Sequence, residues 1–148
     1  RTVSAATEGT SYDISSIAVS VDNLKDTDYS FAAKFSKKMA NLILKKGGLP
    51  KKTLLNINIP DKAEEEIKGI KITKQGDAKF RDYFIKRVDP RGRDYYWMDG
   101  EFIEVTKCID DDFCAIKDGY ISITPIHYDM TNYKKMDYFK KWGIDKEL

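Results

Sequence analysis

Residues 14–21 have the sequence ISSIAVSV, residues 28–46 the sequence DYSFAAKFSKKMANLILKK, and residues 54–59 the sequence LLNINI. The first and third segments are rich in β-branched residues, which is typical of strands buried on both faces. The middle segment places Phe31, Phe35 and Met39 at helical spacing and is followed by Gly47-Gly48, so it predicts an amphipathic helix. A strand, a long helix and a second strand in this order predict a right-handed βαβ unit, and hence an α/β sheet.

Four shorter elements are expected around this unit. The small residues from Thr2 to Glu8 predict a short helix that packs closely on a neighbour, and Ile70–Thr73 predicts a third strand. Nearer the end of the chain, Gly119–Thr124 predicts a strand that Pro125 stops. A helix over about residues 132–142 follows it.

An aromatic-rich β-hairpin is expected over about residues 80–100. Phe80–Val88 and Asp94–Met98 both have a strand-like composition, and the intervening Asp89-Pro90-Arg91-Gly92 is a strong turn signal. A two-stranded arm cannot bury so many aromatic side chains by itself. We therefore expect the arm to pack on another surface, with a second subunit as the natural candidate.

The overall composition is that of an ordinary globular domain. The 148 residues fit a single domain, taken as residues 1–148, and 26 basic against 24 acidic side chains leave a formal net charge of +2. This balance argues against a dedicated nucleic-acid-binding protein, which needs a concentrated surplus of Lys and Arg. No stretch approaches the roughly 20 apolar residues that span a bilayer, so no membrane partner is expected either.

The two cysteines, Cys108 and Cys114, are separated by five residues. This spacing fits neither a zinc site nor a redox C-x-x-C motif. We therefore expect two reduced thiols in a cytoplasmic protein. Because the chain begins with Arg1 and not with Met, the question of a leader removed upstream of residue 1 stays open.

The residues by themselves do not name an enzyme, because the chain carries no established catalytic motif. The single histidine, His127, lies just past Pro125, where a structural role is favoured over metal binding. The run Asp110–Asp112 offers oxygen ligands for Mg²⁺ or Ca²⁺, but a solvated loop is the commoner explanation. The basic residues around the hairpin turn suit either phosphate attraction or a solubilising tip: Lys86, Arg87, Arg91 and Arg93.

Six blocks of the sequence resemble the SurE family. The first, TVSAATEG at residues 2–9, looks like the family's S-G-T-V-x-A-A-x-E-G stretch. All six occur in the family's order and at its spacing, which is more specific than any single motif. The other blocks are residues 17–20, residues 53–60, residues 85–93 with 95–97, residues 112–113, and residues 119–125 with 129–131.

The resemblance implies a fold, an activity and an assembly. The fold is a Rossmann-like three-layer α/β/α sheet, of which this chain would be the C-terminal part, with a protruding β-hairpin and a C-terminal helix. The activity is that of a metal-dependent 5′/3′-nucleotidase, a phosphomonoesterase that acts on nucleoside monophosphates with Mg²⁺ or Mn²⁺. A homo-dimer or homo-tetramer through the hairpin and the C-terminal segment is also implied.

The same resemblance assigns the candidate site residues. Thr2 matches the family's threonine and is expected to hydrogen-bond phosphate at a helix N-terminus, with Ser4 as a weaker candidate. The family's metal ligands (an Asp pair, a Ser and an Asn) lie upstream of residue 1, so this chain is expected to hold no metal, and its catalytic residues stay unassigned. Arg1 replaces the family's glycine, which predicts either a blocked pocket or a direct arginine–phosphate pair.

Two other functions stay open. Without a metal site, the chain would be a non-catalytic oligomerisation or scaffold fragment with an exposed sheet edge. Alternatively, the aromatic hairpin would be a stacking platform for single-stranded nucleic acid, although the near-neutral charge counts against this interpretation.

Overall fold

The computed structural model describes residues 2–23, 28–77, 79–103 and 110–144. Helices and strands alternate through the first half of the chain, as the sequence predicts. The elements in chain order are α1 (Thr2–Ser11), β1 (Ser16–Asp22), α2 (Ser30–Lys45), β2 (Thr53–Pro60), the 3₁₀ turn η1 (Glu64–Glu66), β3 (Ile70–Ile72), β4 (Lys79–Val88), β5 (Asp94–Ile103), α3 (Asp112–Lys117), β6 (Ile121–His127) and α4 (Tyr133–Lys140).

Four strands form the central sheet in the order β1-β2-β6-β3. β1 and β2 are parallel and are joined by α2, which confirms the predicted βαβ unit. β6 runs antiparallel to β2 and parallel to β3, so the sheet is mixed. The carboxyl ends of β1 and β2 therefore lie side by side at one edge of the sheet, at Asp22 and Pro60.

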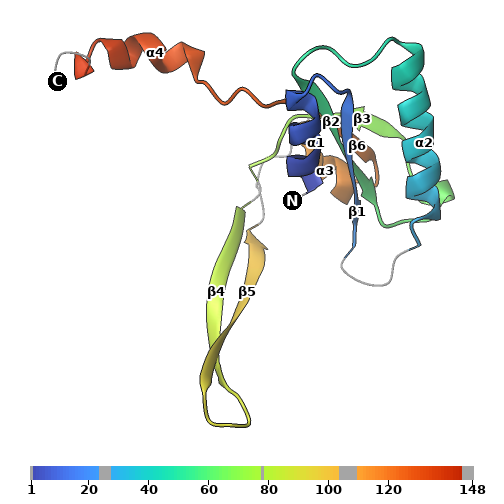
Figure 1. The fold of residues 1–148 in the computed structure, drawn as a ribbon. Coiled ribbons are helices and arrows are strands. Elements are labelled where there is room, and N and C mark those ends of the chain that lie inside the picture. Colours follow the sequence, from blue (N-terminus) through green and yellow to red (C-terminus); the bar gives the residue numbers. More distant parts are fainter. Residues whose placement is uncertain (1, 24–27, 78, 104–109, 145–148) are drawn as a thin grey trace.

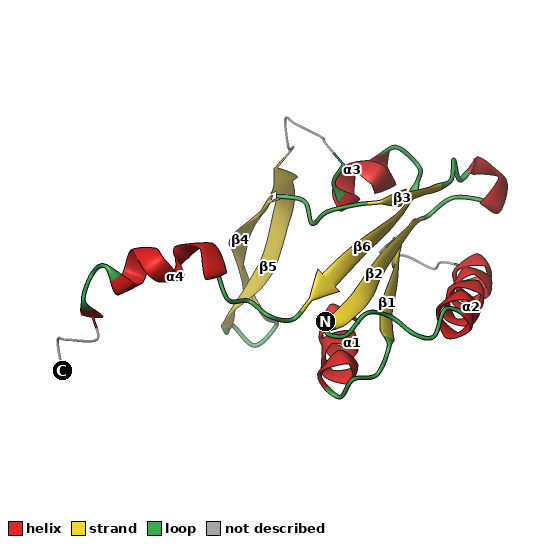
Figure 2. Cartoon of the chain, turned by 90° about the horizontal axis from the view of Figure 1, so that it is seen from above, coloured by secondary structure: helices red, strands yellow, loops and turns green. Residues whose placement is uncertain are grey.

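Helices cover both faces of this sheet, which gives three layers (Figures 1 and 2). On one face, Phe35 of α2 packs against a cluster that includes Ile57 and Ile123. On the other face, Ala6 of α1 packs against Leu54. Side chains alternate along a strand, so Leu54 and Ile57 of β2 point to opposite layers. This is the α/β class that the sequence predicts.

The ends of α1 and β6 differ from the expectation. α1 continues through Gly9 to Ser11. Gly9 lies close to β1, since a Cβ there would lie 2.5 Å from Oγ of Ser16. β6 continues through Pro125, although proline was expected to stop it. β3 pairs with β6 only as far as Ile123. Among the described residues, no strand therefore lies beside Pro125 on that side, and no hydrogen bond is lost because proline lacks an N–H.

The predicted β-hairpin is present as β4 and β5, and it projects away from the sheet in Figure 1. Its turn is closed by the Asp89 carboxylate, whose Oδ1 accepts hydrogen bonds from the backbone N–H groups of Arg91 and Arg93 at 2.8 and 2.9 Å. α4 also extends from the body of the molecule in Figure 1. Both carry exposed large apolar side chains, among them Phe84, Tyr96, Trp97, Met98, Phe139 and Trp142.

The expectation of reduced thiols is contradicted. Cys114 is disulfide-bonded, and none of the described cysteines is free. Cys108 lies outside the described residues. The cysteine argument for a cytoplasmic location therefore falls away. None of the described helices combines the length and the apolar character that crossing a bilayer requires.

Candidate functional site

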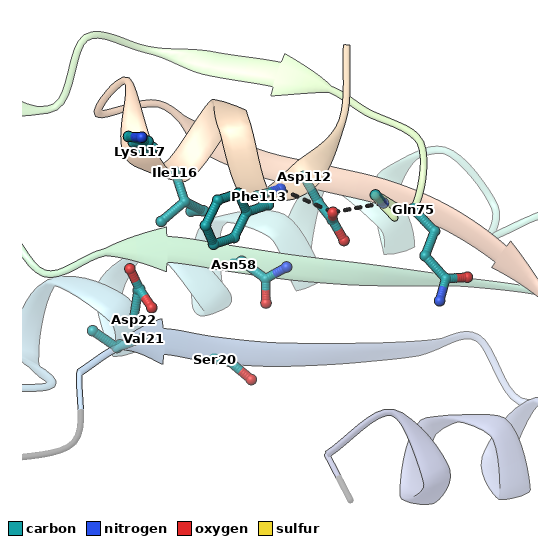
Figure 3. A pocket seen from close by; sticks show the side chains of 10 residues that line it. Ser20, Val21, Asp22, Asn58, Gln75, Asp112, Phe113, Ile116 and Lys117 are labelled. Carbon is teal, nitrogen blue, oxygen red and sulfur yellow. Dashed lines mark hydrogen bonds between the residues drawn. The ribbon is translucent and has the colours of Figure 1, made fainter. Parts of the chain in front are cut away.

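A pocket of about 490 Å³ lies between the carboxyl ends of β1 and β2 and the start of α3 (Figure 3). In open α/β sheets, ligands bind outside the carboxyl ends of the strands. The position of the pocket is therefore that of a binding site in this fold class. Its lining is largely polar on the strand side, and the residues that matter below are Ser20, Asp22, Asn58, Gln75, Asp112 and Phe113.

The sheet register brings Ser20 and Asn58 together. They are direct partners in the parallel pairing of β1 with β2, so their side chains emerge next to each other. Ser20 lies two residues beyond Ala18, and Asn58 lies four residues beyond Leu54. These even spacings put both side chains on the face that packs against α1 rather than α2. Where α1 stops covering this face, the sheet changes from apolar to polar, and the pocket begins.

The second wall of the pocket, Gln75 and Gly76, is held by long-range hydrogen bonds. The N–H of Thr73 donates to the carbonyl of Ile123 at 3.0 Å, and the N–H of Gly76 donates to Oδ1 of Asp112 at 2.9 Å. A Cβ on Gly76 would lie 3.0 Å from that same oxygen, so a glycine permits this close approach. Gln75 is thereby presented toward the pocket from a fixed backbone.

The acidic run Asp110–Asp112 is ordered rather than a solvated loop. The side chain of Asp111 is 6% exposed and caps α3 by accepting a hydrogen bond from the N–H of Cys114 at 2.8 Å. Asp112 bonds the N–H groups of Gly76 and Phe113, both at 2.9 Å. The expected loop is therefore corrected for two of the three residues: Asp111 caps α3 and Asp112 joins α3 to the pocket wall, while Asp110 is exposed.

The predicted phosphate-binding residues, Thr2 and Ser4, lie in the first turn of α1 and are exposed. α1 runs antiparallel to β1, because Gly9 approaches Ser16 and Ala6 packs against Ala18. Thr2 precedes Ala6 by four residues, about 6 Å along the helix axis, and Ser20 follows Ala18 by two residues, about 6.6 Å along the strand. Because the two elements are antiparallel, both displacements point the same way. The N-terminus of α1 is therefore level with Ser20, at the same sheet edge as the pocket. Arg1 lies outside the described residues.

The acidic, histidine and cysteine side chains of the described residues do not gather into a metal-binding cluster. Nowhere in residues 2–23, 28–77, 79–103 and 110–144 do three or more His, Cys, Asp or Glu side chains gather closely enough to hold an ion. Asp22 and Asp112 both line the pocket, but no third ligand of this kind joins them. We therefore derive no catalytic step through a metal from these residues.

The remaining candidates lie away from the pocket. His127 is the exposed last residue of β6. In the hairpin, Lys86 pairs with Asp94 at 2.6 Å and Arg93 with Asp89 at 3.2 Å, so half of the predicted basic cluster is neutralised. These residues give no sign of a phosphate site.

Sequence reasoning missed Ser20, Asn58 and Gln75 as site residues. A signal existed for Asn58, because a polar amide in a buried strand is unusual and cannot contribute to the apolar core. No local signal existed for Gln75, since its place depends on contacts with residues more than 30 positions away.

Comparison with known proteins agrees with this arrangement. The family model described as "Survival protein SurE" matches residues 1–82. 5′-nucleotidase SurE of Symbiobacterium thermophilum is 43% identical over 143 residues, which cover 97% of this chain and 56% of that protein. 5′-nucleotidase SurE of Syntrophomonas wolfei is 46% identical over 141 residues, 95% of this chain and 53% of that protein.

A solved structure extends the similarity to three dimensions. The crystal structure of SurE protein from Aquifex aeolicus superposes with a TM-score of 0.77 at 38% identity, over 96% of this chain and 57% of that one. The fold is therefore the Rossmann-like α/β fold of that protein. The chain belongs to the SurE family, and it spans a little over half the length of the relatives named here.

Proposed function

We propose that this chain is part of a 5′/3′-nucleotidase, a hydrolase that releases phosphate from nucleoside monophosphates. One structural observation carries the proposal: the N-terminus of α1 lies at the carboxyl end of β1, level with the polar pocket. A helix N-terminus offers unpaired N–H groups and the positive end of a dipole, which together suit a phosphate. The names of the relatives, 5′-nucleotidase SurE, support the same activity.

In this proposal Thr2 and Ser4 hold the phosphate. Both side chains are exposed in the first turn of α1 and carry a hydroxyl that can donate a hydrogen bond to a phosphoryl oxygen. The N–H groups of the same turn add donors that are fixed by the helix, so they need no reorganisation when negative charge develops.

The divalent ion that the family resemblance implies, Mg²⁺ or Mn²⁺, belongs in this proposal to the Asp pair, the Ser and the Asn that the resemblance places upstream of residue 1. The described residues offer no cluster of three His, Cys, Asp or Glu side chains in their place. The phosphate contacts of α1 would then complete a site whose metal is held elsewhere. This chain by itself is proposed to bind phosphate and nucleoside but no metal.

The protein is proposed to be cytoplasmic. Its assembly is proposed to be a homo-dimer or homo-tetramer that uses the hairpin and the C-terminal segment. The support lies in exposed apolar side chains on both elements: Trp97 is 57% exposed and Trp142 is 59% exposed. A subunit partner would remove such side chains from water, where they contribute no stability.

The same exposed hairpin supports a second candidate function, a non-catalytic oligomerisation or scaffold piece. The lack of a three-ligand cluster among the described residues favours it for the chain in isolation. The two candidates differ in one respect: only the first requires the α1 hydroxyls for phosphate release.

The test is the Thr2→Ala and Ser4→Ala variants of a form extended at its N-terminus to the length of the relatives. Losing a hydrogen bond to a charged phosphate lowers kcat/KM for adenosine 5′-monophosphate about ten- to a hundredfold. Ser11→Ala, at the opposite end of the same helix, is the matched control and should keep the activity of the unsubstituted form. Unchanged kinetics in both Thr2→Ala and Ser4→Ala would remove α1 from the site.

A further inference from the structure

The pocket beside β1 and β2 is lined by polar side chains that are available to a ligand. Within the described part of the chain, Ser20, Asp22, Asn58 and Gln75 line it and make no side-chain hydrogen bond. They come from three separate segments and converge on one concavity (Figure 3). A few convergent polar groups in a preformed pocket of some 300–1,000 Å³ are the usual composition of a small-molecule site.

The charges of the described lining disfavour a phosphate in this pocket. Asp22 and Asp112 contribute two carboxylates, and Lys117 contributes one cation. The net lining charge is negative, so an anion would be repelled, whereas a neutral ligand with hydrogen-bond donors would be favoured. The anion-binding position is instead the N-terminus of α1, at the level of Ser20.

We propose that this pocket binds the nucleoside moiety of the substrate, while the phosphate lies at α1. The inference rests on the proposed function and adds to it the residues that recognise the nucleoside. The amides of Asn58 and Gln75 each carry a donor and an acceptor, the combination that pairs with the edge of a base. Asp22, at the end of β1, is placed to accept from ribose hydroxyl groups, as acidic residues do in other nucleotide sites.

The apolar part of the lining suits the face of a base. Phe113 and Ile116 project from α3 over the same pocket, opposite the strand residues (Figure 3). α3 is fixed there by the Asp111 cap and by the bond from Gly76 to Asp112. A base would thus lie between an apolar wall and a polar floor, both present before it binds. Such preorganisation reduces the entropy lost on binding.

The direct test is calorimetric titration of the 148-residue chain with adenosine, which carries no phosphate. Gln75→Ala and Asn58→Ala should each weaken adenosine binding about tenfold, as expected for the loss of one or two hydrogen bonds from a base. Asn41→Ala is the matched control, because Asn41 is an exposed asparagine on α2, across the sheet, and its removal should change nothing. Circular dichroism should show equal melting temperatures for all three variants.

Two results would overturn the inference: no adenosine binding by the unsubstituted chain, or equal binding by the Gln75→Ala, Asn58→Ala and Asn41→Ala variants. Kinetics of the extended form separate this inference from the proposed function. There, Gln75→Ala should lower kcat/KM for adenosine 5′-monophosphate about tenfold and leave hydrolysis of p-nitrophenyl phosphate unchanged, because that ester has no nucleoside. Loss of both activities in the unsubstituted extended form would refute the nucleotidase, while adenosine titration would still decide on the pocket.

Discussion

The hydroxyl of Thr73 is predicted to be one of the most important polar groups for stability. It hydrogen-bonds the hydroxyls of Ser122 and Thr124, each at 2.7 Å, and the three residues are 6, 0 and 3% exposed. Ser122 and Thr124 lie two positions apart on one strand, about 6.6 Å, so they cannot bond each other. Thr73→Val keeps the shape of the side chain but leaves both partners buried and unpaired.

The expected cost follows from that geometry. An unpaired buried hydroxyl costs about 1–3 kcal/mol, so two of them lower the free energy of unfolding by about 2–6 kcal/mol. Urea unfolding, followed by circular dichroism, measures this directly. With a slope of about 2 kcal/mol/M for a small protein, the midpoint should fall by about 1–3 M.

Thr53→Val provides the control. Thr53 is also a strand threonine, but its hydroxyl makes only an exposed bond of 3.3 Å to the carbonyl of Lys51, so the variant should stay within about 0.5 kcal/mol of the unsubstituted chain. A Thr73→Val variant as stable as Thr53→Val would refute the reasoning, because the buried hydroxyl bonds would then contribute nothing.

Three further predictions concern the core, the pocket wall and one exposed carboxylate. Leu54→Ala should lower the free energy of unfolding by about 2–5 kcal/mol in the same urea assay, because Leu54 is 0% exposed beneath α1. Gly76→Ala should cost about 1 kcal/mol and shift the Asp112 resonances, since the added Cβ would lie 3.0 Å from Oδ1 of Asp112. Hydrogen bonds, first from the Tyr133 hydroxyl and then from Thr131, lower the pKa of Asp129 from 3.8 to about 2, and the Tyr133 bond also raises the pKa of Tyr133. Because the folded-state pKa of Asp129 is depressed, its contribution to stability is present above about pH 4 and is lost as the pH falls through 2. Carboxyl NMR titration should show a midpoint near 2, and Tyr133→Phe should return it toward 3.8; a midpoint unchanged by that substitution would contradict the assignment.

Most of the fold could be predicted because its determinants are local. The helical spacing of Phe31, Phe35 and Met39 predicted α2, and the β-branched runs predicted β1 and β2 within two residues. The hairpin was also predicted, but its end was not. β5 continues to Ile103 through the poor strand formers Asp99–Glu101, and cross-strand pairing, which includes the 3.5 Å ion pair of Arg81 with Glu101, continues along it.

The parts that could not be predicted depend on tertiary contacts. Pro125 stops a strand in most settings, yet here one side of β6 has no described neighbour at that point. Asp111 caps α3 and Asp112 reaches back to Gly76, contacts that an acidic run does not reveal by composition. The site is a mixture of both: Thr2 and Ser4 come from the family resemblance, and Asn58 and Gln75 were recognised only from the folded chain.

The central claim, that this chain completes a nucleotidase, is tested most directly by phosphate release. Adenosine 5′-monophosphate and other nucleoside monophosphates would be incubated with Mg²⁺ or Mn²⁺ and either the 148-residue chain or the form extended at its N-terminus. The account predicts release by the extended form only, because it assigns the metal ligands to the segment that the family resemblance places upstream of residue 1. Release by neither form would contradict the account and leave a SurE-family scaffold.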